Sequence, residues 1–291
     1  MTNILVPTDF SACADNALKF AVESARLFPL QITLLHCLDL SDNLYTDYVG
    51  LNKEFTRSQL HEVEAKLAKL KANLQETKEI VVDTLIVNGS VKEGILEVTN
   101  DKNIDLVIMG TLGTSGIKEK LWGSRTSDII AKSQVPVMAI PPGYQWKKPK
   151  RILLATNHYE EDPAFLETVF KLANVYKAEL YVVVVTDDTN DAATFLEHSR
   201  ETPRYKRMLN EKFDGGIVTV TNLYGKTFEE TLDDYINKNS IDVLVMVPYK
   251  RSLPDRIFSP SITKRMACHT TIPLLALHTK HDHISILKQR V

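Results

Sequence analysis

Short runs of apolar, often β-branched residues alternate along the chain with longer stretches in which apolar residues recur every three or four positions. The short runs have the length and composition of buried strands, and the longer stretches have the period of amphipathic helices. In the first half the runs cover residues 3–7, 31–37, 79–87, 104–109 and 135–140. Strands that alternate with helices in this way predict a parallel sheet with helices on both faces.

The stretch between the second and third runs predicts a long amphipathic helix. Its apolar residues follow one another in steps of three and four: Leu60, Val63, Leu67, Leu70 and Leu74. Such steps place all of them on one side of a helix. We interpret this stripe as a face that packs on the core, in preference to a partner-binding surface.

The second half of the chain repeats the plan of the first. Residues 152–156 match residues 4–8 at an offset of 148, and residues 241–246 match residues 104–109 at an offset of 137. Each copy has the size of a domain, which predicts a tandem duplication. Proline and lysine interrupt the pattern between the copies. The predicted parts are a domain over 1–143, a second domain over 150–280 and a polar tail over 281–291.

Composition and charge narrow the class of protein. The 35 Lys and Arg and the 37 Asp and Glu leave a net charge of −2, so no global positive field attracts nucleic acid or an anionic membrane. The apolar runs are too short to span a membrane, and no secretory signal precedes the first run. The widely spaced Cys13, Cys37 and Cys268 suit thiols in a reducing compartment. We therefore predict a cytoplasmic protein that binds neither nucleic acid nor membrane.

Ligands of open parallel sheets bind where strands end, so the residues after each run are candidates for a site. The first run ends at Pro7, and Thr8, Asp9 and Ser11 follow it. Asp9 and Ser11 are both able to cap the next helix. On these residues alone, a capping role and a ligand role for Asp9 both stay open.

A glycine-rich segment follows the fourth run. Four of the chain's 11 glycines lie between residues 110 and 124. Glycine lets a backbone approach a phosphate closely, and the amides at the start of a helix attract anions. The segment predicts a phosphate-binding loop, although turns also need glycine.

The spacing in this segment is more specific than the number of glycines. Two residues separate Gly110 from Gly113, and nine separate Gly113 from Gly123, which Ser124 follows. With Pro7-Thr8-Asp9-Phe10-Ser11 after the first run and His36-Cys37-Leu38-Asp39 after the second, this spacing resembles the ATP-binding signature of the universal stress protein family. The resemblance covers the whole chain as two tandem domains, and the glycine motif lies only in the first.

The resemblance implies an α/β protein of two tandem flavodoxin-like, Rossmann-like domains, each with a five-stranded parallel sheet and helices on both faces. It implies ATP or a related adenine nucleotide as the ligand, with Mg²⁺ or Mn²⁺ on the phosphates. In ATP-binding members Asp9 meets the ribose and adenine side, the backbone near Cys37 and Leu38 meets the adenine edge, and the glycine motif holds ribose and phosphates. The cofactor-binding residues so assigned are Pro7, Thr8, Asp9, Cys37, Leu38, Gly110, Gly113, Gly123, Ser124 and Arg125. Arg125 departs from the family's small apolar residue, and it either reaches a phosphate or is a solvated helix residue.

The second copy lacks this motif. The offsets place Asn157 opposite Asp9, and they place Val247, Lys250, Pro260 and Ser261 opposite Gly110, Gly113, Gly123 and Ser124. A proline removes an amide donor, so a phosphate cradle of the same geometry cannot form there. We therefore predict one ATP per chain. The basic residues of this loop form either a site for another anion or a solvated face: Lys250, Arg251, Arg256, Lys264 and Arg265.

Metal and catalytic chemistry have weaker signals. Imidazole and carboxylate groups of the kind that bind zinc cluster near the carboxyl end, at His278, His281, Asp282 and His283. No Walker lysine follows the glycines, and no catalytic base is evident. We predict no enzyme activity beyond the slow ATP hydrolysis or self-phosphorylation that the resemblance allows.

The predicted function is a regulatory or stress-endurance role in which ATP occupancy biases conformation or assembly. The alternative is a non-enzymatic interaction scaffold or small-ligand carrier that does not use ATP. An apolar strand ends each domain, at residues 135–140 and 272–277. Because an unpaired apolar edge is an aggregation hazard, we predict that the two domains pair through these strands within one chain. A homodimer of two chains is also predicted.

Overall fold

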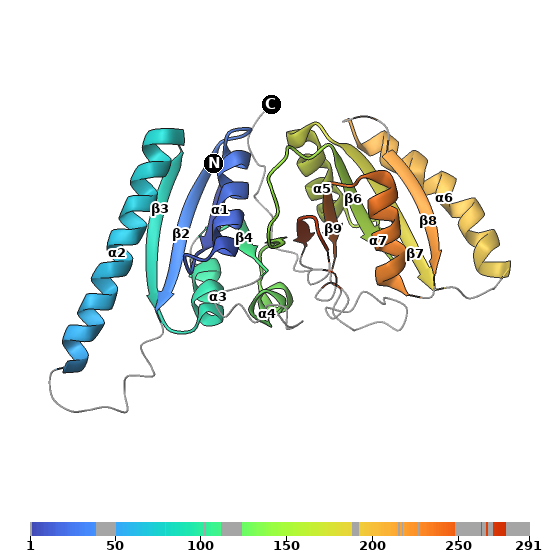
Figure 1. The fold of residues 1–291 in the computed structure, drawn as a ribbon. Coiled ribbons are helices and arrows are strands. Elements are labelled where there is room, and N and C mark those ends of the chain that lie inside the picture. Colours follow the sequence, from blue (N-terminus) through green and yellow to red (C-terminus); the bar gives the residue numbers. More distant parts are fainter. Residues whose placement is uncertain are drawn as a thin grey trace. The chain divides into compact units, whose positions relative to one another are not determined.

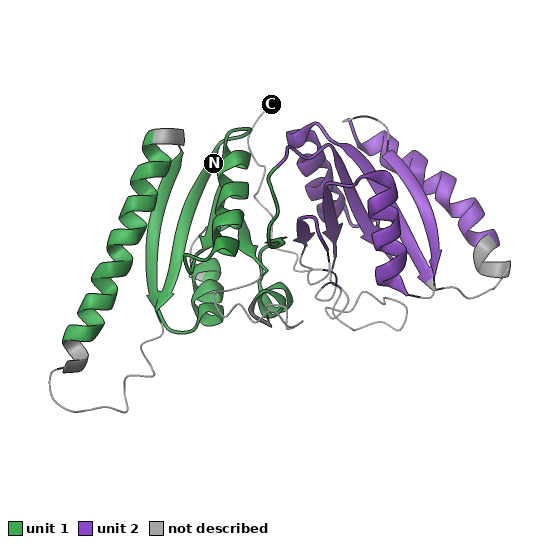
Figure 2. Cartoon of the chain, in the orientation of Figure 1, with its two compact units in different colours: residues 1–146, 288–291 green, residues 147–287 purple. Residues whose placement is uncertain are grey.

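The computed structural model shows a chain of alternating strands and helices (Figure 1). It describes residues 2–38, 51–78, 80–101, 103–111, 124–187, 192–214, 216, 218–225, 227–247, 263, 266 and 270–277. The chain forms two compact units, with the division between Trp146 and Lys147 (Figure 2). None of the helices in these ranges is both long enough and apolar enough to cross a membrane.

The first unit contains a parallel sheet in the order β3-β2-β1-β4-β5. Its strands are β1 (Thr2–Pro7), β2 (Leu30–Leu38), β3 (Val81–Asn88), β4 (Leu106–Gly110) and β5 (Val137–Ile140). Its helices are α1 (Ala12–Ala25), α2 (Leu51–Lys78), α3 (Val91–Asp101) and α4 (Ser124–Lys132).

The strand order of this sheet reverses at β1. The chain steps from β1 outward to β2 and β3, and it then returns to β4 and β5 on the other side. Right-handed crossovers place α1 and α2 on one face of the sheet and α3 and α4 on the other. The carboxyl ends of β1 and β4 therefore form the topological switch point, where open sheets bind ligands.

The apolar stripe of α2 is only partly buried. Val63 and Leu67 are 8% and 2% exposed and pack as predicted, whereas Leu60 is 37% exposed. The prediction was therefore wrong for Leu60. The amino-terminal part of α2 projects past the ends of β2 and β3 (Figure 1).

The second unit has the same topology. Its parallel sheet has the order β8-β7-β6-β9-β10. The strands are β6 (Arg151–Thr156), β7 (Glu179–Asp187), β8 (Val218–Gly225), β9 (Val243–Met246) and β10 (Leu274–Ala276), and the helices are α5 (Pro163–Tyr176), α6 (Ala192–Lys212) and α7 (Phe228–Asn239). The two tandem flavodoxin-like domains are confirmed.

The repeated Ile-Asp before β4 and β9 has a structural cause. Asp105 Oδ2 accepts the N–H of Asn3 at 2.8 Å. Asp242 Oδ2 accepts the N–H groups of Lys150 and Arg151 at 2.8 and 3.0 Å. These hydrogen bonds link the start of β4 to β1 in the first unit and the start of β9 to β6 in the second.

Candidate functional site

The residues after β1 form a strained turn at the switch point. Phe10 has a φ of 59°, in the left-handed region that costs a residue with a side chain about 1–2 kcal/mol. Thr8 Oγ1 accepts the N–H of Phe10 at 3.1 Å, and Asp9 Oδ1 accepts the N–H of Ser11 at 3.0 Å. Ser11 is the N-cap of α1, with its Oγ accepting the N–H of Ala14 at 3.2 Å. Of the two predicted caps, Ser11 therefore caps the helix, whereas Asp9 shapes the turn before it.

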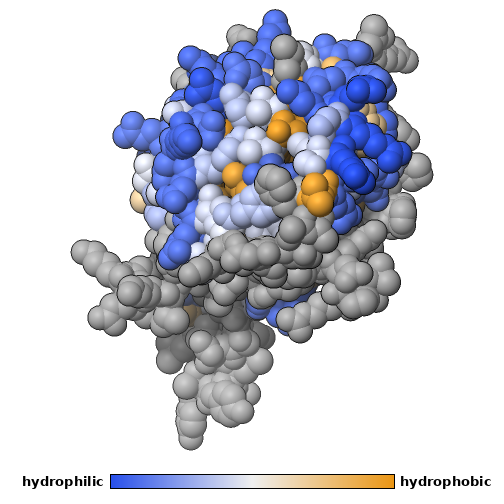
Figure 3. Space-filling view, turned by 90° about the vertical axis from the view of Figure 1, so that its right-hand side faces the viewer, coloured by the Kyte–Doolittle hydropathy of each residue, from blue (hydrophilic) through white to orange (hydrophobic). Residues whose placement is uncertain are grey.

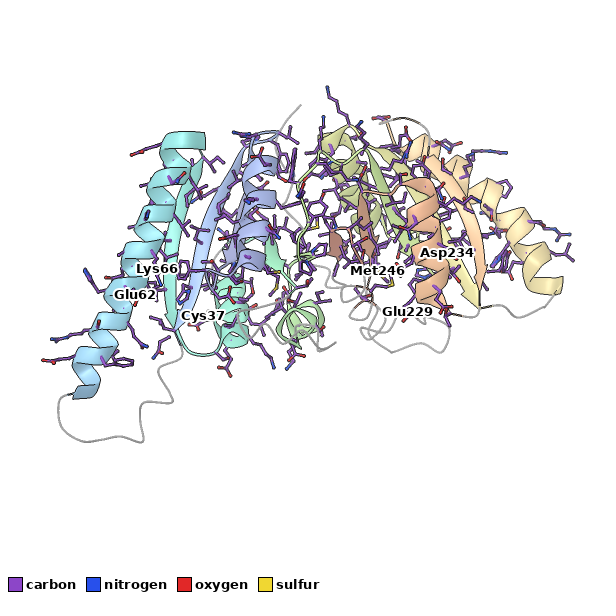
Figure 4. The ribbon with its side chains drawn as sticks, in the orientation of Figure 1. Cys37, Glu62, Lys66, Glu229, Asp234 and Met246 are labelled. Atoms are coloured by element: carbon purple, nitrogen blue, oxygen red, sulfur yellow. The ribbon has the colours of Figure 1, made fainter. Side chains whose placement is uncertain are left out.

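Side chains from β2 and α2 hold the ring of Phe10. It stacks on the imidazole of His36, with centroids 4.9 Å apart and 28° between the planes. Nζ of Lys66 lies 5.4 Å from the Phe10 centroid, and Lys66 pairs with Glu62 one turn away on α2 at 2.6 Å (Figure 4). His36 Nδ1 lies 2.7 Å from the carbonyl oxygen of Thr8, which only accepts, so this nitrogen carries a proton. A strained residue held by several contacts is typical of functional sites.

The backbone of Cys37 faces the switch point. The C=O of Leu35 accepts the N–H of Thr8 at 2.8 Å, which marks the end of β1. Successive backbone groups of a strand point to opposite sides, so the N–H and C=O of Cys37 point the same way as those of Leu35, beyond the end of β1. The carbonyl of Leu38 points the other way and accepts the N–H of Gly89 at 2.8 Å. Of the two residues predicted at the adenine edge, Cys37 is therefore the better placed.

The side chain of Cys37 has a packing role. Burial, and to a smaller degree the charge of Glu97, raises the pKa of its thiol to about 11, so the thiol is neutral at physiological pH. A Cβ atom on Gly94 of α3 would lie 2.7 Å from its Sγ. The thiol thus belongs to the contact between α3 and β2 and is no nucleophile.

Gly110, the last residue of β4, also has a packing reason to be glycine. A Cβ atom there would lie 2.7 Å from both the carbonyl oxygen and the Sγ of Cys13, because α1 approaches β4 closely. The hydroxyl of Thr126 on α4 donates to the carbonyl of Gly110 at 3.0 Å. The identity of Gly110 is explained without a ligand, so this glycine by itself does not indicate a phosphate contact.

Thr111 is a candidate site residue that the glycine motif did not single out. Its N–H donates to the carbonyl of Ile140 at 3.1 Å, and the residue is 2% exposed. Its Oγ1 is buried and has no hydrogen-bond partner within the part of the chain that the structure describes. An unpaired buried hydroxyl costs about 1–3 kcal/mol and requires an explanation, such as a ligand. No sequence pattern distinguishes such a threonine from one in an ordinary core.

The remaining predicted residues of the first unit lie after β4. Gly113 and Gly123 are outside the described residues. Ser124 and Arg125 are the first two residues of α4. The first N–H groups of this helix therefore directly follow the glycine segment, as an anion site requires.

The second unit presents different groups after its central strand. Asn157 follows β6, and its Oδ1 lies 3.0 Å from Nδ1 of His158. Val247, opposite Gly110 in the repeat, is buried. Within the described ranges, no group of three or more His, Cys, Asp or Glu residues could hold a metal ion. The other predicted positions lie outside those ranges: Lys250, Arg251, Arg256, Pro260, Ser261, Lys264, Arg265, His278, His281, Asp282 and His283.

Comparison with known proteins relates the chain to one family. The profile of the universal stress protein family matches residues 1–141 and 148–278. A universal stress protein from Methanocaldococcus jannaschii is 32% identical over 151 residues, which cover 47% of this chain and 93% of that protein. Universal stress protein YxiE from Bacillus subtilis is 27% identical over 143 residues, covering 47% and 97%. The crystal structure of a universal stress protein from Archaeoglobus fulgidus has a TM-score of 0.73 at 16% identity, covering 96% of this chain and 98% of that one, which shows a shared fold.

Proposed function

Because the chain belongs to the universal stress protein family in both of its units, we propose that its first unit binds an adenine nucleotide at the switch point. The proposed ligand is ATP with Mg²⁺ or Mn²⁺ on its phosphates, and its occupancy regulates the conformation or assembly of the protein. One universal stress protein has been solved in complex with cAMP, at a similarity too low to transfer that ligand to this chain. The proposal contains no catalytic step.

The observation that carries the proposal is the unpaired hydroxyl of Thr111 at the carboxyl end of β4. β4 is hydrogen-bonded to β1, so this hydroxyl lies at the same end of the sheet as the strained Phe10 turn. A bound polar ligand would supply the missing partner. The backbone N–H and C=O of Cys37 offer one donor and one acceptor, which match the paired acceptor and donor on the edge of adenine.

The chain's own residues have distinct roles in this proposal. The backbone N–H and C=O of Cys37 form hydrogen bonds with the edge of the base. The carboxylate of Asp9 accepts hydrogen bonds from the ribose hydroxyls. Thr111 bonds to the ribose or the first phosphate. The glycine segment and the first N–H groups of α4 bind the phosphates, to which the divalent ion adds charge neutralisation.

Calorimetric titration of the full chain with ATP, AMP and cAMP, each with and without Mg²⁺, tests the proposal. Thr111→Val keeps the shape of the side chain and removes only the hydroxyl. We expect it to weaken ATP binding about tenfold, the worth of one hydrogen bond. The matched control is Thr263→Val in the second unit, since Thr263 is also buried with an unpaired hydroxyl.

The outcomes separate the proposal from its alternative. ATP affinity that falls in Thr111→Val and stays unchanged in Thr263→Val supports the site. If both variants bind ATP with the same affinity as the unaltered chain, Thr111 is not part of the site. A chain that binds none of the three nucleotides is instead the scaffold or carrier of other ligands, and the proposed function is then wrong.

The proposal also covers the cellular compartment of the protein and the pairing of its domains and chains. We place the protein in the cytoplasm, which is supported by Cys13 and Cys37, since neither forms a disulfide bond with a described residue. Pairing of the two domains through residues 135–140 and 272–277, and the homodimer, stay predictions from the apolar character of those strands.

A further inference from the structure

Aromatic and polar side chains gather in the second unit between α6 and β8. The α6–β8 cluster consists of Tyr159, His198, Thr202, Tyr205, Asn222 and Tyr224. Residues 198, 202 and 205 follow one another on α6 in steps of four and three, so they share one face of the helix. Residues 222 and 224 alternate on β8 and share one face of the sheet. Thr221, between them in register, faces the other way, with its hydroxyl 3.4 Å from that of Tyr235 on α7.

Hydrogen bonds and ring contacts join the members of the cluster. The hydroxyls of Tyr159 and Thr202 lie 2.9 Å apart, and Asn222 Nδ2 donates to Thr202 Oγ1 at 2.5 Å. His198 Nδ1 lies 2.9 Å from the hydroxyl of Tyr224. The ring of Tyr159 makes edge-to-face contacts with Tyr205 and His198, with centroids 5.2 and 6.0 Å away. The cluster is therefore one continuous network.

Two buried acceptors in or beside this network have no hydrogen-bond donor among the described residues. One is Oδ1 of Asn222. The other is Oε2 of Glu160, a residue that is only 3% exposed and is joined to the cluster through its carbonyl, which accepts from the hydroxyl of Tyr205 at 2.7 Å. His158 Nε2 lies 3.4 Å from this Oε2, within ion-pair distance but without hydrogen-bond geometry. Asn222 Oδ1 could accept from a ligand that donates, and so could Glu160 Oε2, which has His158 as its ion-pair partner.

The electrostatics of the cluster favour a positive ligand. Burial raises the pKa of the Tyr205 hydroxyl, and the negative charges of Glu160 and Glu161 raise it further, whereas its hydrogen bond to the Glu160 carbonyl lowers it. The carboxylates of Glu160 and Glu161 thus lie close enough to act on this hydroxyl, and His158 Nε2 lies 3.4 Å from the Glu160 carboxylate. Tyrosine faces attract organic cations through their quadrupole.

We propose that the α6–β8 cluster binds a small organic cation, namely a primary ammonium or guanidinium group on a short apolar chain. Its N–H groups would donate to Asn222 Oδ1 and Glu160 Oε2, and its methylenes would lie against the tyrosine rings. Tyr224 is 40% exposed, so one edge of the cluster lies at the surface, whereas the two acceptors are buried behind it. Figure 3 views the molecule from the side of α6 and β8, and residues of intermediate hydropathy lie there between strongly hydrophilic ones. The site is independent of nucleotide binding in the first unit.

Agmatine is a suitable probe, because it carries an ammonium and a guanidinium group on four methylenes. We titrate it into the full chain at low, constant ionic strength and follow heat and tyrosine fluorescence. The neutral control is 1,4-butanediol, and the anionic control is acetate. We expect agmatine alone to bind and to perturb the tyrosine signal.

Three variants locate the binding. Glu160→Gln removes the charge and keeps the shape, and Asn222→Leu removes the amide; each should weaken agmatine binding at least tenfold. Thr221→Val is the matched control on the same strand, facing α7, and should bind agmatine like the unaltered chain. If Glu160→Gln lowers the midpoint of thermal unfolding, its loss of binding could come from unfolding. The affinity of Asn222→Leu, at a half-buried position, then tests the site.

The proposal is overturned if agmatine binds no better than butanediol, if acetate competes for the site, or if agmatine binds both variants at unchanged affinity. Titration of Gly113→Val keeps the two proposals apart. If the first unit binds ATP, this variant should lose that binding. It should bind agmatine like the unaltered chain whether or not the first unit binds ATP.

Discussion

Phe10 occupies a backbone conformation that a glycine or asparagine would adopt at lower cost. Two hydrogen-bonding side chains before it, Thr8 and Asp9, fix the turn, and its ring gains contacts with His36 and Lys66. The energy of those contacts offsets the backbone strain. The turn is thus held in place by tertiary contacts that no local pattern contains.

A pair of substitutions separates the strain from the ring contacts. Phe10→Ala loses the ring and keeps the strain, whereas Phe10→Gly loses both. We therefore expect the glycine variant to be more stable than the alanine variant by about 1 kcal/mol. Urea unfolding of the full chain measures the difference. Equal stability of the two variants would show that the turn relaxes and that no strain is stored there.

Gly110 at the end of β4 and Thr111 directly after it show what could not be predicted from the sequence. The motif identified Gly110, but the cause of this glycine is the close approach of Cys13 on α1, nearly one hundred positions earlier in the chain. Thr111 is conspicuous only because its hydroxyl is buried without a partner. Both facts depend on three-dimensional neighbours. Spacing could place the candidate site at the exit of β4, but it could not assign a cause to each residue.

At the scale of elements, the contact of α3 with β2 depends on a missing side chain. In an exposed helix Gly→Ala stabilises by about 1 kcal/mol. In α3 the new Cβ of Gly94→Ala would lie 2.7 Å from Cys37 Sγ and 3.4 Å from Val87 Cγ1. We expect a loss of about 1–3 kcal/mol from this overpacking, measured by urea unfolding.

The control for this prediction is the same substitution in a Cys37→Ala background. Removal of the sulfur makes room for the new methyl group, so the sign of the effect should reverse there to that of ordinary helix propensity. A Gly94→Ala variant that is more stable than the unaltered chain would contradict the packing argument.

Asp242, at the start of β9, makes the second unit sensitive to acid. Burial raises the pKa of its carboxyl, but hydrogen bonds from Lys147 and from the N–H groups of Lys150 and Arg151 together lower it below its ordinary value. A lowered pKa in the folded state gives stability that is present above the ordinary pKa of about 3.9 and is lost as the pH falls through the folded value. The side chain of Lys147 is 60% exposed, so solvent screens its share of this effect, whereas the two backbone N–H groups are fixed at the start of β6.

We therefore expect Asp242→Asn to destabilise the protein by about 1–3 kcal/mol at pH 7, because an amide accepts less strongly than a carboxylate and has a donor facing Lys147. The difference between variant and unaltered chain should shrink below about pH 4. Urea unfolding at pH 7, 5 and 3.5 measures it. A difference that is constant over this range would show that the charge of Asp242 contributes nothing.

The strands themselves were predictable because buried parallel strands are continuous apolar runs. The runs at 3–7 and 31–37 became β1 (Thr2–Pro7) and β2 (Leu30–Leu38). Ends shifted by up to two residues, as in β4 (Leu106–Gly110) for the run at 104–109, because pairing with the neighbour rather than composition decides where a ladder begins. The exposure of Leu60 was not predictable, because the helical period shows which side of α2 is apolar but not how far the sheet covers that side.

At the scale of the whole molecule, the two units share their scaffold but differ at the strand exits. Asp105 and Asp242 make equivalent bonds to the start of the central strand in each unit. After that strand, the first unit has Asp9 and Phe10, and the second has Asn157 and His158. Since ligands contact strand exits while the scaffold only positions them, the two units should bind different ligands.

This divergence predicts the stoichiometry of nucleotide binding. Val247 is buried where the first unit has Gly110, and Pro260, which has no amide N–H, stands where it has Gly123, so we expect no equivalent phosphate cradle in the second unit. The full chain should therefore bind one ATP, measured by calorimetry. Gly113→Val combined with Gly123→Val places side chains where phosphates approach the backbone, and this double variant should bind no ATP while its circular dichroism stays unchanged. Two equivalent sites in the unaltered chain, or one site that survives in the double variant, would contradict the assignment of nucleotide binding to the first unit alone.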